Sequence, residues 1–235
     1  MTTATITSPS RTHTSKFWEH LWRQSGISFV VFAVVAYLIH GRQPHAGASA
    51  DALMAFYDAH HTRILIATVL SGMAVLNLLW FAAAIRTTEA DAGEDGWGAA
   101  ATASSAVVGV LFLLLITVSA ALAFSIARPG NEALTRGLND FMWSLFVLSG
   151  FPRAMLIMSG TFGLWRAKLI SNGLFGAGVA LIVLGVLSGT TWMSSGFWAP
   201  HGAFSRLIMP ILSIVWVLVV SRILLKRVPA ARAGW

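Results

Sequence analysis

Apolar residues in this chain are gathered into long uninterrupted stretches, with polar residues between them. Five stretches are long enough to cross a membrane as helices: residues 64–85, 99–127, 141–165, 169–192 and 204–225. A helix needs about 20 mainly apolar residues to cross about 30 Å of hydrocarbon. The second of these stretches, 99–127, is closed by the motif RPG, whose proline cannot continue a helix. We therefore predict a transmembrane helix from each stretch.

A sixth apolar run, GISFVVFAVVAYLI at residues 26–39, has only 14 residues. It becomes a plausible span if its helix begins near Trp22 and the Arg23 side chain extends to the lipid headgroups. The run is also short enough for the core of a signal peptide, but Arg42 and Pro44 separate it from the small-residue motif AGASA. We favour the span. The expected fold is all-α: a polytopic integral membrane protein with a six-helix transmembrane bundle.

The segment before the first span predicts a short amphipathic helix at the membrane interface. In KFWEHLWRQ, one helical face carries the apolar side chains, and these are Phe17, Trp18, Leu21 and Trp22. We therefore divide the chain into a cytoplasmic arm with this helix at 1–25, the transmembrane bundle at 26–227 and a cytoplasmic tail at 228–235. Between the second and third spans, the acidic stretch at 86–98 predicts a flexible connector that contains glycine.

Small residues within the spans predict close contacts between helices. They occur as SG at 149 and 159 and as GLFGAG from 173. Small side chains let helix backbones approach one another within a bilayer. This pattern predicts a compact bundle and does not indicate a partner.

Lysine and arginine are shared unequally between the two sides that six spans define. Ten lie on the side of the termini: Arg11, Lys16, Arg23, Arg86, Arg166, Lys168, Arg222, Lys226, Arg227 and Arg232. Five lie on the opposite side or at its boundary: Arg42, Arg63, Arg128, Arg136 and Arg206. Because cytoplasmic loops of membrane proteins are enriched in these residues, both termini are predicted to be cytoplasmic. We expect the protein in the bacterial cytoplasmic (inner) membrane.

The composition supports a membrane protein and narrows its chemistry. Hydrophobic residues make up 56% of the 235 residues, charged residues 11%, and the mean hydropathy is +0.73. A soluble domain carries about 25% charged residues. The net charge of +7 is spread singly over the ends of apolar segments, so it indicates orientation rather than nucleic-acid binding. The expected partners are the lipid bilayer and other membrane subunits or copies of this chain. The chain has no cysteine, which excludes disulfides, thiolate metal sites and a cysteine nucleophile.

The order of these features resembles the DUF4386-like family of small bacterial polytopic membrane proteins of unknown function. The resemblance covers residues 26–227. It depends on the short first span, ALMAFYDAHHTRILIA, a span ending in LLWFAAAIR, the acidic loop and IVWVLVVSRILL in the last span. The stretch LWRAKLISNG departs from the family's expected proline–tryptophan turn between the fourth and fifth spans. The resemblance implies a six-helix bundle and no known activity.

Histidines gather on the predicted outer side and form the first candidate site. The outer histidines are His40, His45, His60, His61 and His201. His60, His61 and His201 with Asp58 are the candidate metal site, because imidazole and carboxylate groups are common zinc and copper ligands. On a helix, however, His60 and His61 point about 100° apart, so they cannot share one metal without ligands from other elements. We predict no cofactor and read these residues as polar groups where the second span surfaces. A metal or haem site and a pH-sensing cluster remain the alternatives.

Arg153 in SGFPRAMLIMSG forms the second candidate site. It is the one charge placed deep inside a predicted span, so it is expected to face the bundle interior or a wet cavity. No span has an acidic residue at this depth, and Asn77 and backbone carbonyls near Pro152 are the expected partners. A fixed cation at mid-membrane depth is also a plausible site for an anionic small molecule or lipid.

The sequence does not decide the function. No carboxylate pair, nucleophile motif or metal motif indicates an enzyme. The first hypothesis is a non-catalytic accessory or envelope-associated membrane protein. The second is a binder or transporter of an anionic small molecule or lipid at Arg153, and the third is a metal- or haem-dependent oxidoreductase that uses the outer histidines.

Overall fold

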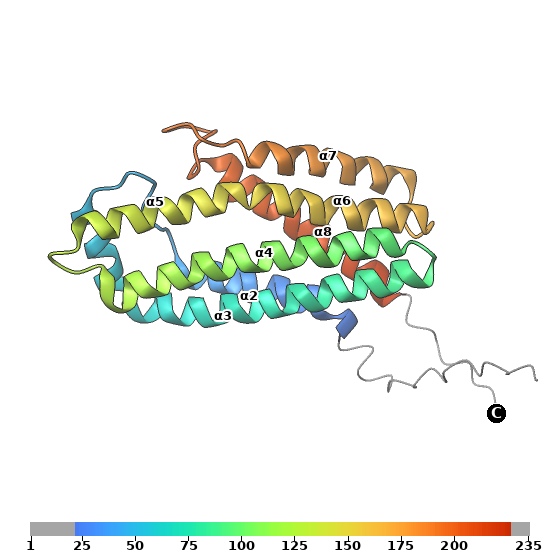
Figure 1. Cartoon of the computed structure of the whole chain (residues 1–235), viewed down its shortest axis with the longest axis horizontal. Coiled ribbons are helices and arrows are strands. Elements are labelled where there is room, and N and C mark those ends of the chain that lie inside the picture. Colours follow the sequence, from blue (N-terminus) through green and yellow to red (C-terminus); the bar gives the residue numbers. More distant parts are fainter. Residues whose placement is uncertain (1–21, 227–235) are drawn as a thin grey trace, which may run out of the picture.

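The computed structural model describes residues 22–226, and in this part of the chain the helices lie side by side along one axis (Figure 1). The α-helices are α2 (Ser25–His40), α3 (Ala50–Asp91), α4 (Asp95–Ala121), α5 (Glu132–Leu148), α6 (Gly150–Arg166), α7 (Asn172–Ser188) and α8 (Met209–Leu225). Two π-helical segments are η1 (Leu122–Ile126) and η2 (Phe204–Ile208). Residues 22–226 contain no strand, so the all-α prediction is confirmed for them.

Four continuous helices are long and apolar enough to cross a membrane: Ala50–Asp91, Asp95–Ile126, Glu132–Arg166 and Phe204–Leu225. Each corresponds to one of the predicted spans. The other two predicted spans correspond to shorter apolar helices, α2 with 16 residues and α7 with 17. Most of the predicted amphipathic helix at the N-terminus lies outside the described residues.

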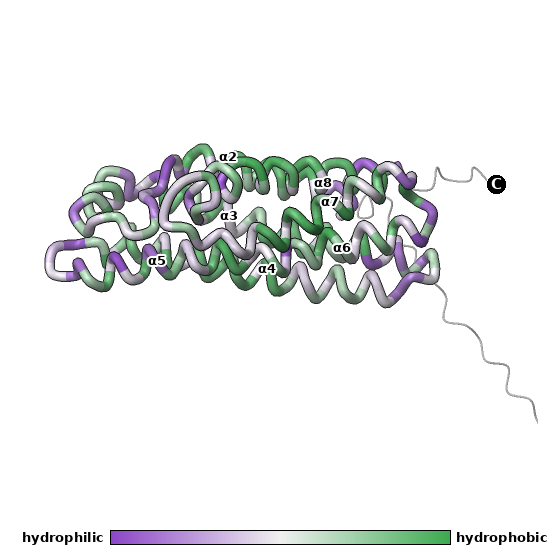
Figure 2. Tube along the Cα trace, turned by 90° about the horizontal axis from the view of Figure 1, so that it is seen from above, coloured by the Kyte–Doolittle hydropathy of each residue, from purple (hydrophilic) through white to green (hydrophobic). Residues whose placement is uncertain are grey.

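We call the end of the bundle with the turn at 92–94 the inner end and the end with the loop at 41–49 the outer end, after the predicted orientation. Hydrophilic residues are concentrated at these two ends, and the section between them is mainly hydrophobic (Figure 2). Large apolar side chains are exposed on that middle section, for example Leu76, Val110 and Val183. This distribution fits a lipid environment, because an apolar side chain that faces lipid tails is not exposed to water and carries no hydrophobic penalty.

Helix α3 is much longer than its predicted span. It begins at Ala50, where the Ser49 side chain accepts a hydrogen bond from the Ala52 amide and caps the helix. Its 42 residues measure about 63 Å, about twice the thickness of the hydrocarbon core. Leu53 and Tyr57 are buried while Asp51 and Asp58 are exposed, so residues 50–63 form an amphipathic extension outside the apolar section.

The prediction of a flexible connector at 86–98 was wrong for most of its length. Helix α3 continues to Asp91 and α4 begins at Asp95, which leaves only a tight turn. Gly93 adopts a φ of 82°, in the left-handed region that glycine enters without a steric penalty. The many polar residues here had indicated a loop, but they cover the solvent side of helices that continue past the apolar section.

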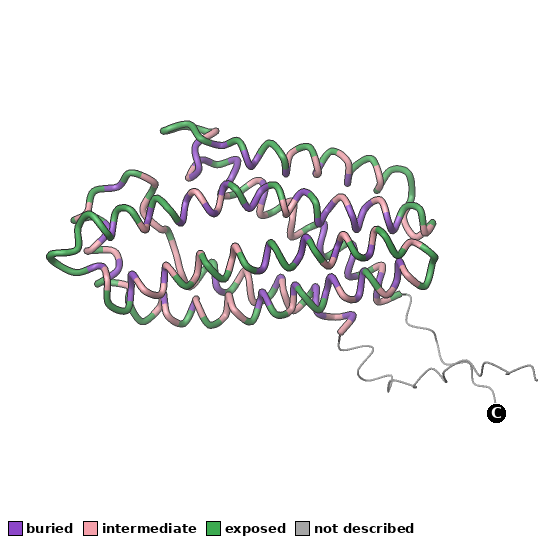
Figure 3. The backbone as a smooth tube through the Cα atoms, in the orientation of Figure 1, coloured by how far each residue is buried: buried purple, intermediate pink, exposed green. Residues whose placement is uncertain are grey.

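The buried apolar residues form two separate cores. The main core lies between the inner end and the middle of the bundle and includes Phe81, Ile85 and Trp216. The second core lies at the outer end: Ala48, Leu53, Tyr57, Ile64, Leu122, Ala123, Ala127 and Met142. Buried positions follow the facing sides of the helices along the whole bundle (Figure 3). The outer ends of α3, α4 and α5 thus form a packed outer layer.

Glycines set the spacing of α6 and α7, as the small-residue pattern predicts. A Cβ atom added to Gly150 would lie 2.5 Å from the Ser188 Oγ and 2.6 Å from the Gly189 amide nitrogen. Gly185 packs in the same way on Ala154. The end of α7 is therefore level with the start of α6, and α5 extends beyond it toward the outer end (Figure 1).

Candidate functional site

The four residues of the predicted metal site do not come together. Asp58, His60 and His61 lie on α3 and line a shallow hollow of about 350 Å³ on that helix. The His60 ring packs edge-on against Phe56 at 5.2 Å, and His61 Nδ1 is 3.4 Å from Thr62 Oγ1. Within residues 22–226 no group of three or more His, Asp or Glu side chains is placed to hold a metal ion.

His201 instead faces another histidine. It lies in the loop at 189–203, with its ring centroid 5.3 Å from that of His45 and 6.2 Å from that of Trp143. Its Nδ1 atom is buried and has no hydrogen-bond partner among the described residues. Burial lowers the pKa of the His201 imidazole, and the neighbouring His45 and Arg206 lower it further. His201 therefore loses its proton more readily than an exposed histidine.

Arg153 and Asn77 each bond to their own helix. The Arg153 Nε donates to the Ser149 carbonyl oxygen at 3.1 Å, and the guanidinium lies 5.4 Å from the centroid of the Phe146 ring. The Asn77 side-chain amide donates to the Met73 carbonyl oxygen at 2.8 Å. The backbone carbonyl that we expected near Pro152 is thus present, but no described hydrogen bond joins Arg153 to Asn77.

Arg153 lies close to the start of α6. It is three residues from Gly150, which packs on the last turn of α7. The stretch 141–165 reads as one span, yet its first residues belong to α5, which continues into the outer layer. The continuous hydrophobicity of the stretch concealed this boundary between α5 and α6.

Two arginines and a histidine lie near the end of α2, and the two arginines carry the positive charge of the group. Both Arg63 of α3 and Arg206 of η2 lie within electrostatic range of the His40 ring. The Arg63 guanidinium packs against Gly41, which caps the carboxyl end of α2 with a φ of 73°. We call His40, Arg63 and Arg206 the outer cationic cluster.

No acidic side chain neutralises this cluster within the described residues. The one ion pair between side chains there joins Arg166 to Glu94 at 2.8 Å, at the inner end. The Arg63 Nε is buried and has no hydrogen-bond partner among the described residues. The carboxyl end of α2 offsets part of the Arg63 charge through its dipole, but that end provides only partial negative charge.

Arg206 lies in a π-helical turn, which is a frequent feature of functional sites. Pro210 lacks an amide hydrogen, so the Arg206 carbonyl cannot receive the usual bond from the residue four positions later. The sequence therefore removes one α-helical hydrogen bond at Arg206. This irregularity was not apparent from hydropathy.

Hydrogen bonds across elements hold the outer layer beside the cluster. His40 Nε2 lies 3.2 Å from the Ser119 hydroxyl. The fully buried Asn139 accepts a bond from the Gln43 amide at 3.3 Å and donates to the His45 carbonyl at 3.1 Å. Trp143 Nε1 donates to the Pro44 carbonyl at 3.0 Å. These bonds fix the loop at 41–49 on α5.

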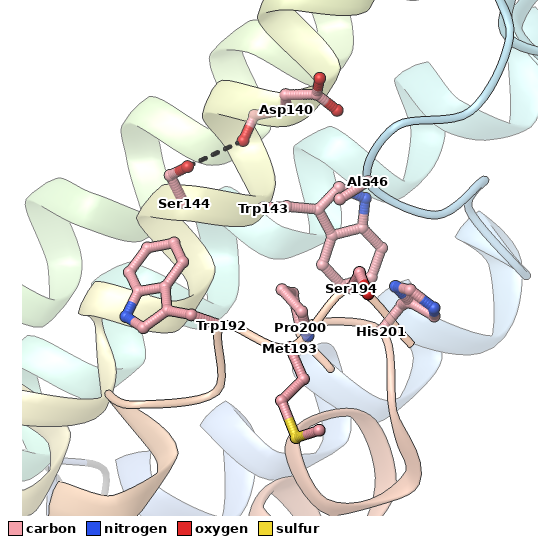
Figure 4. Close-up of a pocket in the computed structure, with 9 residues that line it drawn as sticks. All are labelled: Ala46, Asp140, Trp143, Ser144, Trp192, Met193, Ser194, Pro200 and His201. Carbon is pink, nitrogen blue, oxygen red and sulfur yellow. Dashed lines mark hydrogen bonds between the residues drawn. The ribbon is translucent and has the colours of Figure 1, made fainter. Parts of the chain in front are cut away.

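A hollow of about 280 Å³ opens between this loop, α5 and the loop at 189–203 (Figure 4). Its lining combines aromatic, polar and apolar side chains: Ala46, Asp140, Trp143, Ser144, Trp192, Met193, Ser194, Pro200 and His201. Figure 4 shows Trp143 in the centre of this group, between His201 and Trp192. Asp140 accepts the Gly47 amide at 2.8 Å, so its carboxylate is engaged with the loop. The hollow is a wide surface feature beside the cationic cluster.

The Asn139→Ala substitution is expected to loosen the loop at 41–49. It leaves the His45 carbonyl and the Gln43 amide without their bonds, which costs about 1–3 kcal/mol of unfolding free energy for a buried group. Faster hydrogen exchange of the loop amides would show this. Asn131→Ala, which removes an exposed side chain in the nearby turn, is the control and is expected to leave that exchange unchanged.

Comparison of the chain with family models, with curated proteins and with solved structures finds no match.

Sequence reasoning recognised the individual residues of the outer cationic cluster but not their association. Arg63 and Arg206 were counted as boundary residues and His40 was not separated from the other histidines. Arg63 follows His40 by 23 residues, and Arg206 follows Arg63 by 143 residues. Only the packing of α2, α3 and η2 therefore brings the three residues together. Arg206 and Pro210, four residues apart, are the one local signal that indicates an irregular helix there.

Proposed function

We propose that this chain is a six-span protein of the bacterial cytoplasmic membrane with both termini in the cytoplasm, and that it acts as a non-catalytic binding or accessory protein. The four long apolar helices and the two shorter ones support the span count. The hydrophilic ends on either side of an apolar section support the placement (Figure 2). In this placement α3 crosses the bilayer at 64–85, and residues 50–63 belong to an extracytoplasmic layer. The resemblance to the DUF4386-like family remains a prediction.

The function proposed for the outer end is the binding of an anionic group. The observation behind it is that Arg63 and Arg206 approach His40 with no acidic partner in the described chain. Arginine presents a planar fork of donors that suits the oxygens of phosphate and carboxylate. In the proposed placement the cluster lies near the level of the lipid headgroups, where a lipid phosphate or a soluble anion has access. A phosphate oxyanion is therefore the proposed chemistry.

Arg153 is a weaker candidate for the same role. Its Nε is bonded to a carbonyl of its own helix, and its guanidinium is covered on one side by Phe146. These contacts describe an arginine that stabilises the junction of α5 and α6. The oxidoreductase hypothesis stays a prediction; Asp58, His60 and His61 lie on α3 and His201 lies in the loop at 189–203.

The Arg63→Gln/Arg206→Gln double variant tests the proposal. The purified protein in a neutral detergent is titrated with short-chain phosphatidylglycerol, with short-chain phosphatidylcholine and with inorganic phosphate, and tryptophan fluorescence reports binding. Charge-assisted hydrogen bonds contribute about 1.5–3 kcal/mol each, so the double variant should bind the phosphate-bearing probe at least about tenfold more weakly. Binding of phosphatidylglycerol alone indicates a lipid headgroup, and binding of inorganic phosphate indicates a soluble anion.

The matched control is Arg128→Gln, which removes an exposed outer arginine that bonds to the Phe124 carbonyl at 3.3 Å. It is expected to keep the wild-type affinity. Equal affinities of the wild type and the double variant for every probe, or an equal loss in the control, would refute an anion site at the cluster.

A further inference from the structure

Glu89 at the inner end is a carboxyl group buried without a partner. Its side chain is 0% exposed, and neither Oε1 nor Oε2 has a hydrogen-bond partner among the described residues. Phe81, Ile85 and Glu89 follow one another at intervals of four residues, so they share one face of α3. The first two belong to the main core. Glu89 thus occupies a position where this face would otherwise carry an apolar side chain.

Helix α6 is shaped to accept this carboxyl group. Gly163 lies directly against it, and a Cβ atom added to Gly163 would overlap the Glu89 carboxyl atoms. Gly160, one turn earlier on α6, packs against Ile85 and Trp216. Two glycines therefore allow α6 to approach the face of α3 that carries Ile85 and Glu89. The close approach leaves no space for water around the carboxyl oxygens.

The charged groups nearby do not neutralise a carboxylate at this position. Glu94, in the turn before α4, acts on Glu89 with a charge of the same sign, and its own partner is Arg166 of α6. On α3, Arg86 packs its side chain on Gly98 of α4. From the residues before α2, Arg23 donates to the Leu224 carbonyl of α8. No described ion pair reaches Glu89 from α3, α4, α6 or α8.

A carboxylate in such a site would lose its hydration and gain nothing in exchange. Removal of an ionised carboxyl group from water costs far more than the folded state of a small protein can offset, so the group takes up a proton instead. The proton makes the side chain neutral and compatible with the contact between α3 and α6. If that contact opens, water reaches the carboxyl group and the proton is released.

We propose that Glu89 is a proton-binding site on the cytoplasmic side of the protein, occupied while α3 and α6 are packed together and emptied when they separate. Glu89 lies four residues past Ile85, outside the segment 64–85 that crosses the bilayer in the proposed placement. The site therefore exchanges protons with the cytoplasm. This inference comes from the inner end and is independent of the anion site at the outer end.

Infrared spectroscopy of the full chain in lipid nanodiscs tests the site. At pH 7 the wild type is expected to show the C=O stretching band of a protonated carboxylic acid, and this band should disappear in Glu89→Gln. The control is Asp91→Asn, which removes an exposed carboxylate from the same helix end and should leave the band in place. A wild-type spectrum at pH 7 with no protonated carboxyl band would overturn the proposal, and it does so even if a variant fails to fold.

Thermal unfolding measures the coupling between the proton and the packing. An unfolded chain releases this proton above about pH 4.3, while the folded chain retains it, so the wild type should lose stability as the pH rises from 5 to 8. Compared with Glu89→Gln, its melting temperature should fall by about 5–10 °C over this range. A constant difference between the two proteins across the range would show that the carboxyl group is ionised in the folded state and would also overturn the proposal.

Discussion

The Asp58→Cys variant is expected to react with a membrane-impermeant maleimide in intact cells, and the Asp91→Cys variant only after the cells are permeabilised. Both residues are exposed on the same continuous helix, α3, one in its outer part and one at its inner end. They lie 33 residues apart, which corresponds to about 50 Å along the helix. Because the hydrocarbon core is about 30 Å thick, the two labels must fall on opposite sides if α3 crosses the bilayer at 64–85. The chain contains no cysteine, so each variant has a single reactive thiol.

The two variants control for each other. The same helix carries both thiols, and both should be labelled equally in detergent. Labelling of both positions in intact cells, or of neither, would contradict a transmembrane α3. Labelling of position 91 alone would invert the orientation, and the outer cationic cluster would then face the cytoplasm.

The Gly150→Ala variant is expected to lose about 1–3 kcal/mol of unfolding free energy, because the new methyl group meets fixed backbone atoms. A Cβ atom at this position lies 2.6 Å from the Gly189 amide nitrogen and 3.0 Å from the Gly185 carbonyl oxygen. Neither atom belongs to a side chain that could rotate away, so α6 and α7 must separate. A lower melting temperature of the purified protein in detergent would show the loss.

Gly137→Ala on α5 is the matched control. Nothing lies within 4 Å of a Cβ atom added there, and alanine stabilises an exposed helix interior relative to glycine by about 0.5–1 kcal/mol. The two identical substitutions should thus change stability in opposite directions. If both raised the melting temperature, the close contact between α6 and α7 would not exist in the protein.

The positions of the helices follow largely from the sequence, because long apolar stretches report directly on the section that must face lipid. Residues 64–85 and 204–225 both fall within helices of the structure, and the second range coincides with η2 and α8. What hydropathy does not record is where a helix continues in water. The extension at 50–63 and the helical residues of 86–98 are polar on their exposed side. Hydropathy alone therefore predicts loops there, although the segments are helices packed on other helices.

The sequence by itself determined an all-α chain with a central apolar section, since the length and uniform hydrophobicity of a stretch are local properties. It also identified Arg153 as unusual and the histidines as an outer group. Only the tertiary structure decided which of these residues meet. Arg63 and Arg206 both lie near His40 because α2 ends beside α3 and η2, and Glu89 is buried because Gly163 lets α6 approach. Contacts between distant segments depend on the packing of whole helices, and no local pattern in the sequence records that packing.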